Sequence, residues 1–483
     1  MTGGSESMLL AILPEIGLLV LVGLVLTVDL IWAKERKGTL GWVTFIGLLV
    51  ISIVTLIFVR PPEEAQLIFG GMLRFDEAGY IFRLIFIAGA ALTALFALEC
   101  DGLERGEFYI LLLVSTFGMS LMASSSDLVM LYLAVETASI PLFVLAGFLV
   151  KEKKSVEAGI KYLLFGAMAS AIMLYGFTLL YGFSGTTQIY DIAAQLLSNE
   201  IPALPMTTAI LLVMIGFGFK ASIAPFHFWA PDVYEGAPTP VTGFLSTASK
   251  AAGFAVLIRV LTVVFPDIAS TWTLFLAVLA TLSMFIGNYL ALVQKNIKRM
   301  LAFSSISHAG YILLGLAAGS SFGISATIYY LIAYLVTNLA AFGVITIAGR
   351  TLGSDQISAY AGLSRRSPAL ALAMLVAILS LGGIPPFAGF IAKLLVFSAV
   401  IEANMVWLAF VGIFNAVIAL YYYLNVLKVM YLFRSEDEDK PVPIAKPWKL
   451  ALVICVLGIF VVGTIIAPWF SWAGAAATSF LGI

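Results

Sequence analysis

Three lysines lie inside apolar runs that otherwise have the length and composition of membrane spans: Lys220, Lys250 and Lys393. A cation at the centre of a hydrocarbon layer costs roughly 2.5 to 3.5 kcal/mol on insertion scales, so such a residue normally faces protein or water and is a functional candidate. A buried amine can gain or lose a proton as nearby charges change. The chemistry that these lysines predict is proton transfer within a membrane.

The candidate counter-ion for these lysines is Glu136, in the run LYLAVETASIPLF and one turn before Pro141. Burial favours the neutral form of a lysine or a glutamate, whereas proximity to each other favours the charged form of both. At an effective dielectric near 20, a pair about 4 Å apart interacts by roughly 4 kcal/mol. We therefore expect Glu136 to approach Lys220, and separation of the two to release a proton near neutral pH.

Polar residues could connect these sites. Lys250 shares its span with Ser246, Thr247 and Ser249, and the span that begins near residue 300 opens with a serine-rich run that ends at His308. Histidine titrates near neutrality and can relay protons. A lone buried histidine is also commonly a structural, hydrogen-bonded group, so both roles stay open for His308. Lys393 would end the route.

The composition requires elements that cross a membrane. Of the 483 residues, 61% are hydrophobic and 11% are charged, and the mean hydropathy of +1.07 excludes a soluble domain. Runs long enough to cross about 30 Å of hydrocarbon predict an all-α polytopic membrane protein with about fourteen transmembrane helices. Their approximate bounds are 8–32, 40–58, 78–98, 108–124, 127–150, 157–183, 206–224, 240–264, 271–292, 300–318, 324–349, 369–400, 405–432 and 448–470. Such long runs exclude a transmembrane barrel.

Lysine and arginine are distributed unequally between the two sets of loops. Loops after odd-numbered spans carry most of them, whereas the opposite loops carry only Arg60 and Arg74. By the positive-inside rule, both termini should face the outer side. Four further cations, Arg83, Lys161, Arg259 and Lys428, lie near span ends, and we expect them to extend toward the lipid headgroups.

A short motif that occurs twice in the sequence indicates two related halves. The runs IAPF at 223–226 and IPPF at 384–387 each follow glycines and lie near a lysine. Each proline frees a carbonyl about one turn earlier, near Ala221 in the first run and near Leu381 or Gly382 in the second. A simple packing kink is the alternative, but a charged residue beside each break favours a binding or transfer site.

The repeated motif predicts two five-helix repeats of opposite topology, each with a broken helix. The expected parts are residues 1–105 with the first three helices, 106–265 with the first repeat, 266–435 with the second, inverted repeat, and 436–483 with a charged inner loop and the last helix.

Several long motifs resemble one known family. The runs KASIAPFHFWAPDVYEGAPTPVTGFLSTASK, IKRMLAFSSISHAGYILLG and GIPPFAGFIAKLLVF resemble the antiporter-like membrane subunits of respiratory complex I. The run KYLLFGAMASAIMLYGFTLLYGFSGT is most similar to the N-type subunits of that family. The resemblance covers about residues 105 to 435 and is weak in the first three helices and the last.

The resemblance implies a proton-translocating subunit of an NADH:quinone oxidoreductase in the bacterial plasma (inner) membrane. By matching motifs, Glu136 corresponds to the glutamate that modulates the pump, Lys220 to the proton site, Lys250 to the connecting lysine and Lys393 to the lysine that exchanges with the outer side. Other membrane subunits, the peripheral redox arm and lipid are the implied partners, and nucleic acid is not among them.

The resemblance places NADH, FMN, iron-sulfur clusters and quinone on partner subunits. The sequence agrees, because Cys100 and Cys455 form no C-x-x-C pair that could hold a cluster or a structural zinc. We expect no cofactor and no metal on this chain. Two alternatives stay open. One is a subunit of a multisubunit cation/proton antiporter or a membrane-bound hydrogenase, which share these repeats, and the other is a scaffold that transports nothing.

Overall fold

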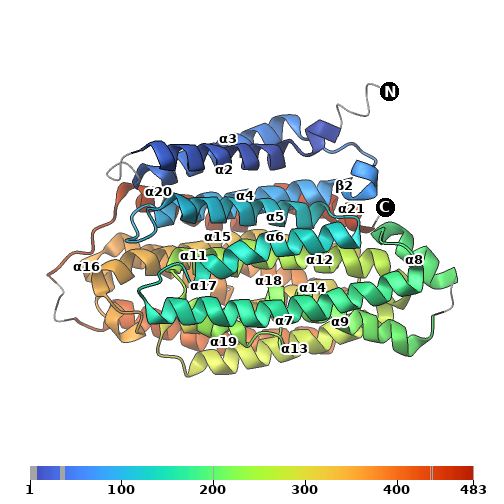
Figure 1. Ribbon diagram of the computed structural model, residues 1–483. Coiled ribbons are helices and arrows are strands. Elements are labelled where there is room, and N and C mark those ends of the chain that lie inside the picture. The colour runs from blue at the N-terminus through green and yellow to red at the C-terminus, as the bar shows by residue number, and fades with distance from the viewer. Residues whose placement is uncertain (1–7, 33–37, 199–200, 436, 438, 482–483) are drawn as a thin grey trace.

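The computed structural model describes residues 8–32, 38–198, 201–435, 437 and 439–481. Nearly all of them belong to helices, and the long helices run side by side as one bundle (Figure 1). The first half contains α2 (Leu13–Ile31), α3 (Leu40–Phe58), β1 (Gln66–Ile68), η2 (Phe69–Gly71), β2 (Leu73–Phe75), α4 (Glu77–Ala97), α5 (Gly106–Ser124), α6 (Leu128–Ala146), α7 (Lys153–Ser184), α8 (Ile189–Ser198), α9 (Ala203–Ala221), α10 (Trp229–Gly236), α11 (Thr239–Phe244), η3 (Leu245–Ser249) and α12 (Lys250–Val264).

The second half contains η4 (Pro266–Ile268), α13 (Ala269–Leu292), α14 (Ile297–Ala317), α15 (Ser321–Leu352), η5 (Ile357–Tyr360), α16 (Leu363–Arg366), α17 (Pro368–Gly382), α18 (Ala388–Glu402), α19 (Val406–Leu432), α20 (Lys446–Thr464) and α21 (Ile466–Leu481). Within the described ranges, 13 helices are long and apolar enough to cross a membrane. The predicted span at 369–400 is the exception, because it is divided into α17 and α18. The expected all-α membrane fold is confirmed, and this break lies at the predicted double proline.

Two strands and two helices are among the elements that were not predicted. Strands β1 and β2 form an antiparallel hairpin before α4, and helices α8 and α21 follow α7 and α20. The predicted last span, 448–470, is in fact two helices, because the chain leaves the helical conformation at Ile465. The strands are only three residues long, and α8 is short and amphipathic, so neither has a hydropathy signal that resembles a span.

The core of the bundle is formed by α14 and α15. In α14, all residues of the most apolar 18-residue segment are buried, and in α15 the buried share of that segment is 94%. In α2, at the edge of the bundle, the buried share is only 28%. Asn296 and Ser320 begin these two helices, because their side-chain oxygens accept hydrogen bonds from the N–H groups of the first turn. A helix that is apolar on all sides must be surrounded by protein or by lipid, and here protein surrounds both.

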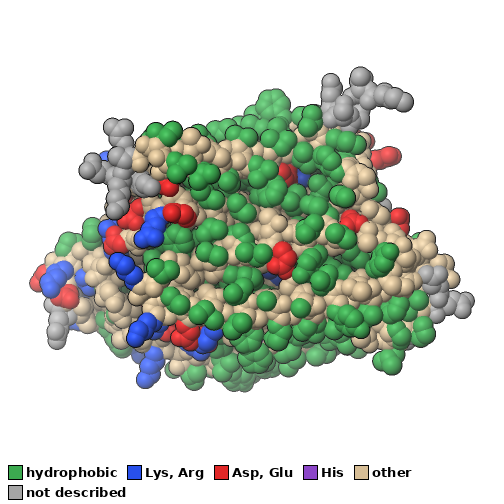
Figure 2. Space-filling view, in the orientation of Figure 1, with side chains coloured by type: hydrophobic (Ala, Val, Ile, Leu, Met, Phe, Trp, Pro, Cys, Tyr) green, Lys and Arg blue, Asp and Glu red, His purple; other side chains and the backbone are tan. Residues whose placement is uncertain are grey.

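The two ends of the bundle differ. The described chain begins and finishes at the same end (Figure 1). On the face shown in Figure 2, the lysine and arginine side chains gather mainly at the opposite end. An even number of crossings accounts for both observations and agrees with the predicted distribution of loops.

Matching features recur in the two halves of the chain. Helices α7 and α15 are both 32 residues long and both end at a left-handed glycine, Gly185 and Gly353. An isolated bridge pairs Asp127 with Gln188 in the first half, and another pairs Asn296 with Gln356 in the second. Helix α7 packs on α9, and α15 packs on α18. The inverted relation of the halves stays a prediction that these features support.

Candidate functional site

Lys220 lies at the end of α9, where the chain breaks. Ser222 adopts the left-handed conformation with φ 57°, and the N–H groups of Ser222 and Ile223 bond back to the carbonyls of Phe219 and Gly218. The Trp229 indole donates to the Phe219 carbonyl at 3.0 Å. The sequence predicted a freed carbonyl near Ala221. The carbonyl that accepts this side-chain hydrogen bond belongs to Phe219, two positions earlier. The break leaves Lys220 buried, with its side chain 4% exposed.

The Lys220 amine donates to Ser139 Oγ at 2.7 Å. Glu136 lies one turn earlier on the same helix, α6, but it is half-buried and accepts a hydrogen bond from Ser170 on α7. Within the described chain, Lys220 and Glu136 form no direct ion pair, so the expected contact is wrong. The reason is angular, because residues at i and i+3 on a helix point about 60° apart, and Glu136 faces α7 while Ser139 faces α9. Glu136 still acts on the amine electrostatically.

Lys250 begins α12, immediately after the π-helical turn η3. Its amine donates to the carbonyl oxygen and the hydroxyl of Ser305 on α14, at 2.5 and 2.6 Å. One turn further along α12, Gly253 packs so closely on Lys220 that a Cβ at this position would lie 3.2 Å from Lys220 Cγ. The structure thus brings the first two lysines onto adjoining faces of α9 and α12. π-helical turns are frequent at functional sites.

His308 is buried between two tyrosine hydroxyls. Its Nδ1 lies 2.8 Å from Tyr330 Oη, and its Nε2 lies 3.1 Å from Tyr423 Oη. The Tyr423 hydroxyl also bonds Ser304, at 2.5 Å. Each hydroxyl can donate or accept, so the hydrogen bonds can reverse when the imidazole changes its tautomer. The histidine is therefore well held and also able to pass a proton, so both roles foreseen for it stay open.

Lys393 binds the carbonyls that the double proline frees. Its amine donates to Leu381 O at 2.9 Å and to Gly382 O at 3.1 Å, and these are the two carbonyls predicted from the sequence. The amine also lies 4.9 Å from the centre of the Tyr311 ring. A cation over an aromatic face is stabilised by the ring quadrupole. The break between α17 and α18 is therefore a lysine-binding feature and more than a packing kink.

The predicted residues form a series across the bundle from α6 through α9, α12 and α14 to α18. Lys220, Lys250 and Lys393 are 4%, 0% and 4% exposed. In the part of the chain that the structure describes, none of the three has a carboxylate as a direct partner, and their ligands are hydroxyl and carbonyl oxygens. Such amines can exchange protons with neighbouring hydroxyl groups.

Sequence reasoning missed the tyrosines that surround this series. Tyr311, Tyr330 and Tyr423 are buried and contact His308 or Lys393. A tyrosine in an apolar span has a hydroxyl that needs a partner, and this was an available signal. It could not be used from the sequence, because tyrosine is also common at membrane interfaces.

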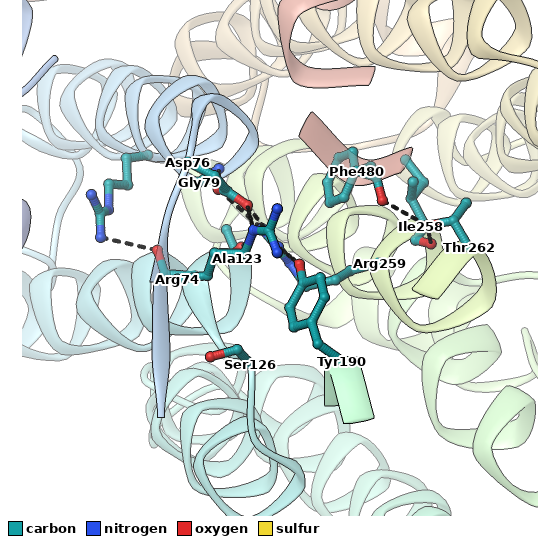
Figure 3. Close-up of polar contacts among 12 residues, drawn as sticks. Arg74, Asp76, Gly79, Ala123, Ser126, Tyr190, Ile258, Arg259, Thr262 and Phe480 are labelled. Carbon is teal, nitrogen blue, oxygen red and sulfur yellow. Dashed lines mark hydrogen bonds and ion pairs between the residues drawn. The ribbon is translucent and has the colours of Figure 1, made fainter. Parts of the chain in front are cut away.

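Two arginines expected to reach the headgroups are instead buried in ion pairs. Arg259 binds both oxygens of Asp76, at 2.7 and 3.2 Å, and also the Tyr190 hydroxyl and the Ala123 carbonyl (Figure 3). Arg83 lies 2.7 Å from Glu15. Both arginines are 2% exposed, so the expectation was wrong for them. Their partners come from distant parts of the chain.

Metal binding finds no support within the described residues. They contain no group of three His, Cys, Asp or Glu side chains that could hold an ion, and Cys100 and Cys455 are free.

Comparisons with known proteins give consistent results. Residues 125–419 match the family described as NADH:quinone oxidoreductase/Mrp antiporter, transmembrane. NADH-quinone oxidoreductase subunit N of Moorella thermoacetica is 45% identical over 422 residues, which cover 86% of this chain and 88% of the relative.

Two solved structures are similar to the chain. A chain of respiratory complex I from Thermus thermophilus is 33% identical with a TM-score of 0.79, covering 95% of this chain and 98% of that one. A chain of the Mrp complex from Dietzia sp. has a TM-score of 0.83 at 22% identity, covering 100% of this chain and 98% of that one. The second likeness shows a shared fold alone.

Proposed function

The chain belongs to the NADH:quinone oxidoreductase/Mrp antiporter membrane family and is a proton-translocating membrane subunit of an NADH:quinone oxidoreductase, and from this premise we propose that Glu136, Lys220, Lys250, His308 and Lys393 carry its protons. The observation that supports this assignment is the burial of three lysines on hydroxyl and carbonyl ligands. A permanently charged, structural cation would be expected to have a carboxylate partner.

The proposed roles follow the contacts. Glu136 acts on Lys220 through space, so a change in the charge or position of the carboxylate changes the proton affinity of the amine. Lys250 receives protons through Ser305, and His308 passes them between Tyr423 and Tyr330. Lys393, beyond this tyrosine layer, exchanges them with the outer side.

The antiporter alternative has less support. Its similar structure is 22% identical and shows the fold alone, whereas the subunit N relative is 45% identical over most of both chains. A scaffold that transports nothing has no use for three buried lysines without carboxylates.

The assembly follows from the same relatives. The chain associates with other membrane subunits of its complex. We further propose that NADH, FMN, iron-sulfur clusters and quinone are bound by partner subunits, that the peripheral redox arm is reached through neighbouring subunits, and that the complex lies in a bacterial plasma membrane with both termini outside. Purification in mild detergent should recover this chain with subunits that carry flavin and iron.

The assignment of the first two sites is tested with Glu136→Gln and Lys220→Ala in the assembled complex. Each variant should lower quinone reduction and the coupled proton uptake of reconstituted vesicles by about tenfold or more, because each removes a titrating group from the route. The matched control is Lys440→Ala, which removes an exposed loop lysine paired with Asp437. Wild-type activity in both site variants would refute the roles of Glu136 and Lys220.

A further inference from the structure

One fully buried tyrosine comes after the Lys220 break and before Lys250 in the sequence. Tyr234 is on α10, the short helix after the break, and its side chain is 0% exposed. Its ring is held by edge contacts with Trp229 and Phe342 at centroid distances of 6.0 and 6.3 Å. The ring position is therefore fixed by packing.

The Tyr234 hydroxyl faces two serines. It interacts with Ser222, which follows Lys220 and Ala221 at the break, and with Ser305, which binds Lys250. Neither contact has the geometry of a hydrogen bond, and the hydroxyls of Tyr234 and Ser222 are both buried without a partner. Buried polar groups are nearly always hydrogen-bonded, so each exception needs an explanation.

Ser222 has an unusual backbone conformation for its residue type. Its φ of 57° lies in the left-handed region, which glycine occupies readily and serine rarely does. Residues held in such conformations cluster at functional sites. A glycine here would remove the strain, and it would also remove the hydroxyl at the break that interacts with Tyr234.

We propose that Tyr234 is the proton relay between the Lys220 break and Lys250, with Ser222 and Ser305 as its two neighbours. Ser222 gives its hydroxyl proton to the Tyr234 oxygen and takes one from Lys220, while the phenol proton passes to Ser305, whose own hydroxyl proton goes to the neutral amine of Lys250. The three hydroxyl groups are neutral before and after the transfer, Lys220 has lost one proton and Lys250 has gained one. This inference rests on the proposed function and names the link between its first two lysines.

The direct test is Tyr234→Phe, which removes the oxygen and keeps the ring that packs on Trp229 and Phe342. Coupled proton uptake in reconstituted vesicles should fall by about tenfold or more. The remaining rate should show a larger solvent deuterium effect, because the weakened transfer becomes limiting, and a purely structural defect would not change this effect. The matched control is Tyr360→Phe, since Tyr360 is also fully buried with a partnerless hydroxyl but lies in η5 near α16.

A second variant, Ser222→Gly, removes the other hydroxyl while the backbone keeps a conformation that glycine accepts. It should impair uptake like Tyr234→Phe, and the double variant should be no worse than either single one, because both lie on one path. Wild-type uptake in Tyr234→Phe, with Lys220→Ala still inactive, overturns the relay and leaves the proposed function standing. Additive losses in the double variant would also overturn it.

Discussion

Lysine and arginine have different partners inside this protein. Arg83 and Arg259 bind the carboxylates of Glu15 and Asp76, whereas the hydrogen-bond partners of Lys250 and Lys393 among the described residues are hydroxyl or carbonyl oxygens. The guanidinium group stays charged under all ordinary conditions and its fork matches a carboxylate, so a buried arginine is a fixed charge that needs a fixed counter-ion. The lysine amine can lose its proton. These two arginines join helices through fixed ion pairs, whereas Lys220, Lys250 and Lys393, for which we propose proton transfer, have no such pair in the described structure.

The Arg259 pair can be tested without altering side-chain size. Asp76→Asn keeps the N-cap of α4, because asparagine also caps helices, but it leaves Arg259 without its counter-ion. Removing one partner of a buried pair typically costs about 3 to 5 kcal/mol. We expect a loss of this size in the free energy of unfolding, measured by denaturation of the purified protein in detergent.

The matched control for this prediction is Glu157→Gln, which breaks an exposed pair with Lys161. Exposed pairs contribute about 0 to 1 kcal/mol, so the stability should change little. Equal effects of the two substitutions would contradict the structural role given to Arg259.

At the scale of helices, glycines set how closely neighbouring backbones approach. A Cβ at Gly310 on α14 would lie 2.7 Å from the carbonyl oxygen of Ala280 on α13, and one at Gly287 on α13 would lie 2.6 Å from the Ser307 nitrogen. Such small residues permit close helix packing in membranes, where no hydrophobic force drives association. This contact fixes α14, and α14 carries Ser305 and His308.

Gly310→Ala should therefore disturb both stability and the site. The new methyl group would push α14 away from α13, and overpacking of this kind typically costs about 1 to 3 kcal/mol. We expect a lower melting temperature in detergent together with reduced proton uptake. Gly23→Ala on α2 is the control, because nothing lies within 4 Å of its Cβ position and alanine favours helix by about 1 kcal/mol. A melting temperature in Gly310→Ala as high as in this control would rule out the close contact.

At the scale of the whole molecule, the charged end and the end at which the described chain begins and finishes are separated by the long helices (Figures 1 and 2). The positive-inside rule assigns the charged end to the inner side. The direction of transport depends on this orientation, because Lys393 is proposed to exchange protons with the outer side.

Orientation can be measured with a thiol reagent that does not cross membranes. Thr351→Cys lies at the end of α15 on the charged side, and Ser198→Cys lies on α8 on the side of the termini, both at exposed positions. In intact cells, the cysteine at residue 198 should react and the one at residue 351 should react only after the membrane is opened. The parent protein with Cys100 and Cys455 supplies the background. The reverse pattern would invert the proposed topology.

The membrane class, the approximate spans and the unusual position of three lysines could be predicted from the sequence. Hydropathy over a span reports the thermodynamics of burial in lipid, and this needs no knowledge of neighbours. A lysine in such a span is anomalous in any fold, so Lys220, Lys250 and Lys393 were identifiable. The carbonyl ligands of Lys393 were predictable too, because they follow from the local geometry of proline.

Only the tertiary structure decided which side chains meet. Lys220 contacts Ser139 and not Glu136, Arg259 binds Asp76, and Tyr234 interacts with both Ser222 and Ser305. These contacts join helices that are distant in the sequence, and they depend on the rotation of each helix about its axis. In a span that is apolar on nearly every side, the sequence contains little information about that rotation, because lipid and protein neighbours both favour the same residues.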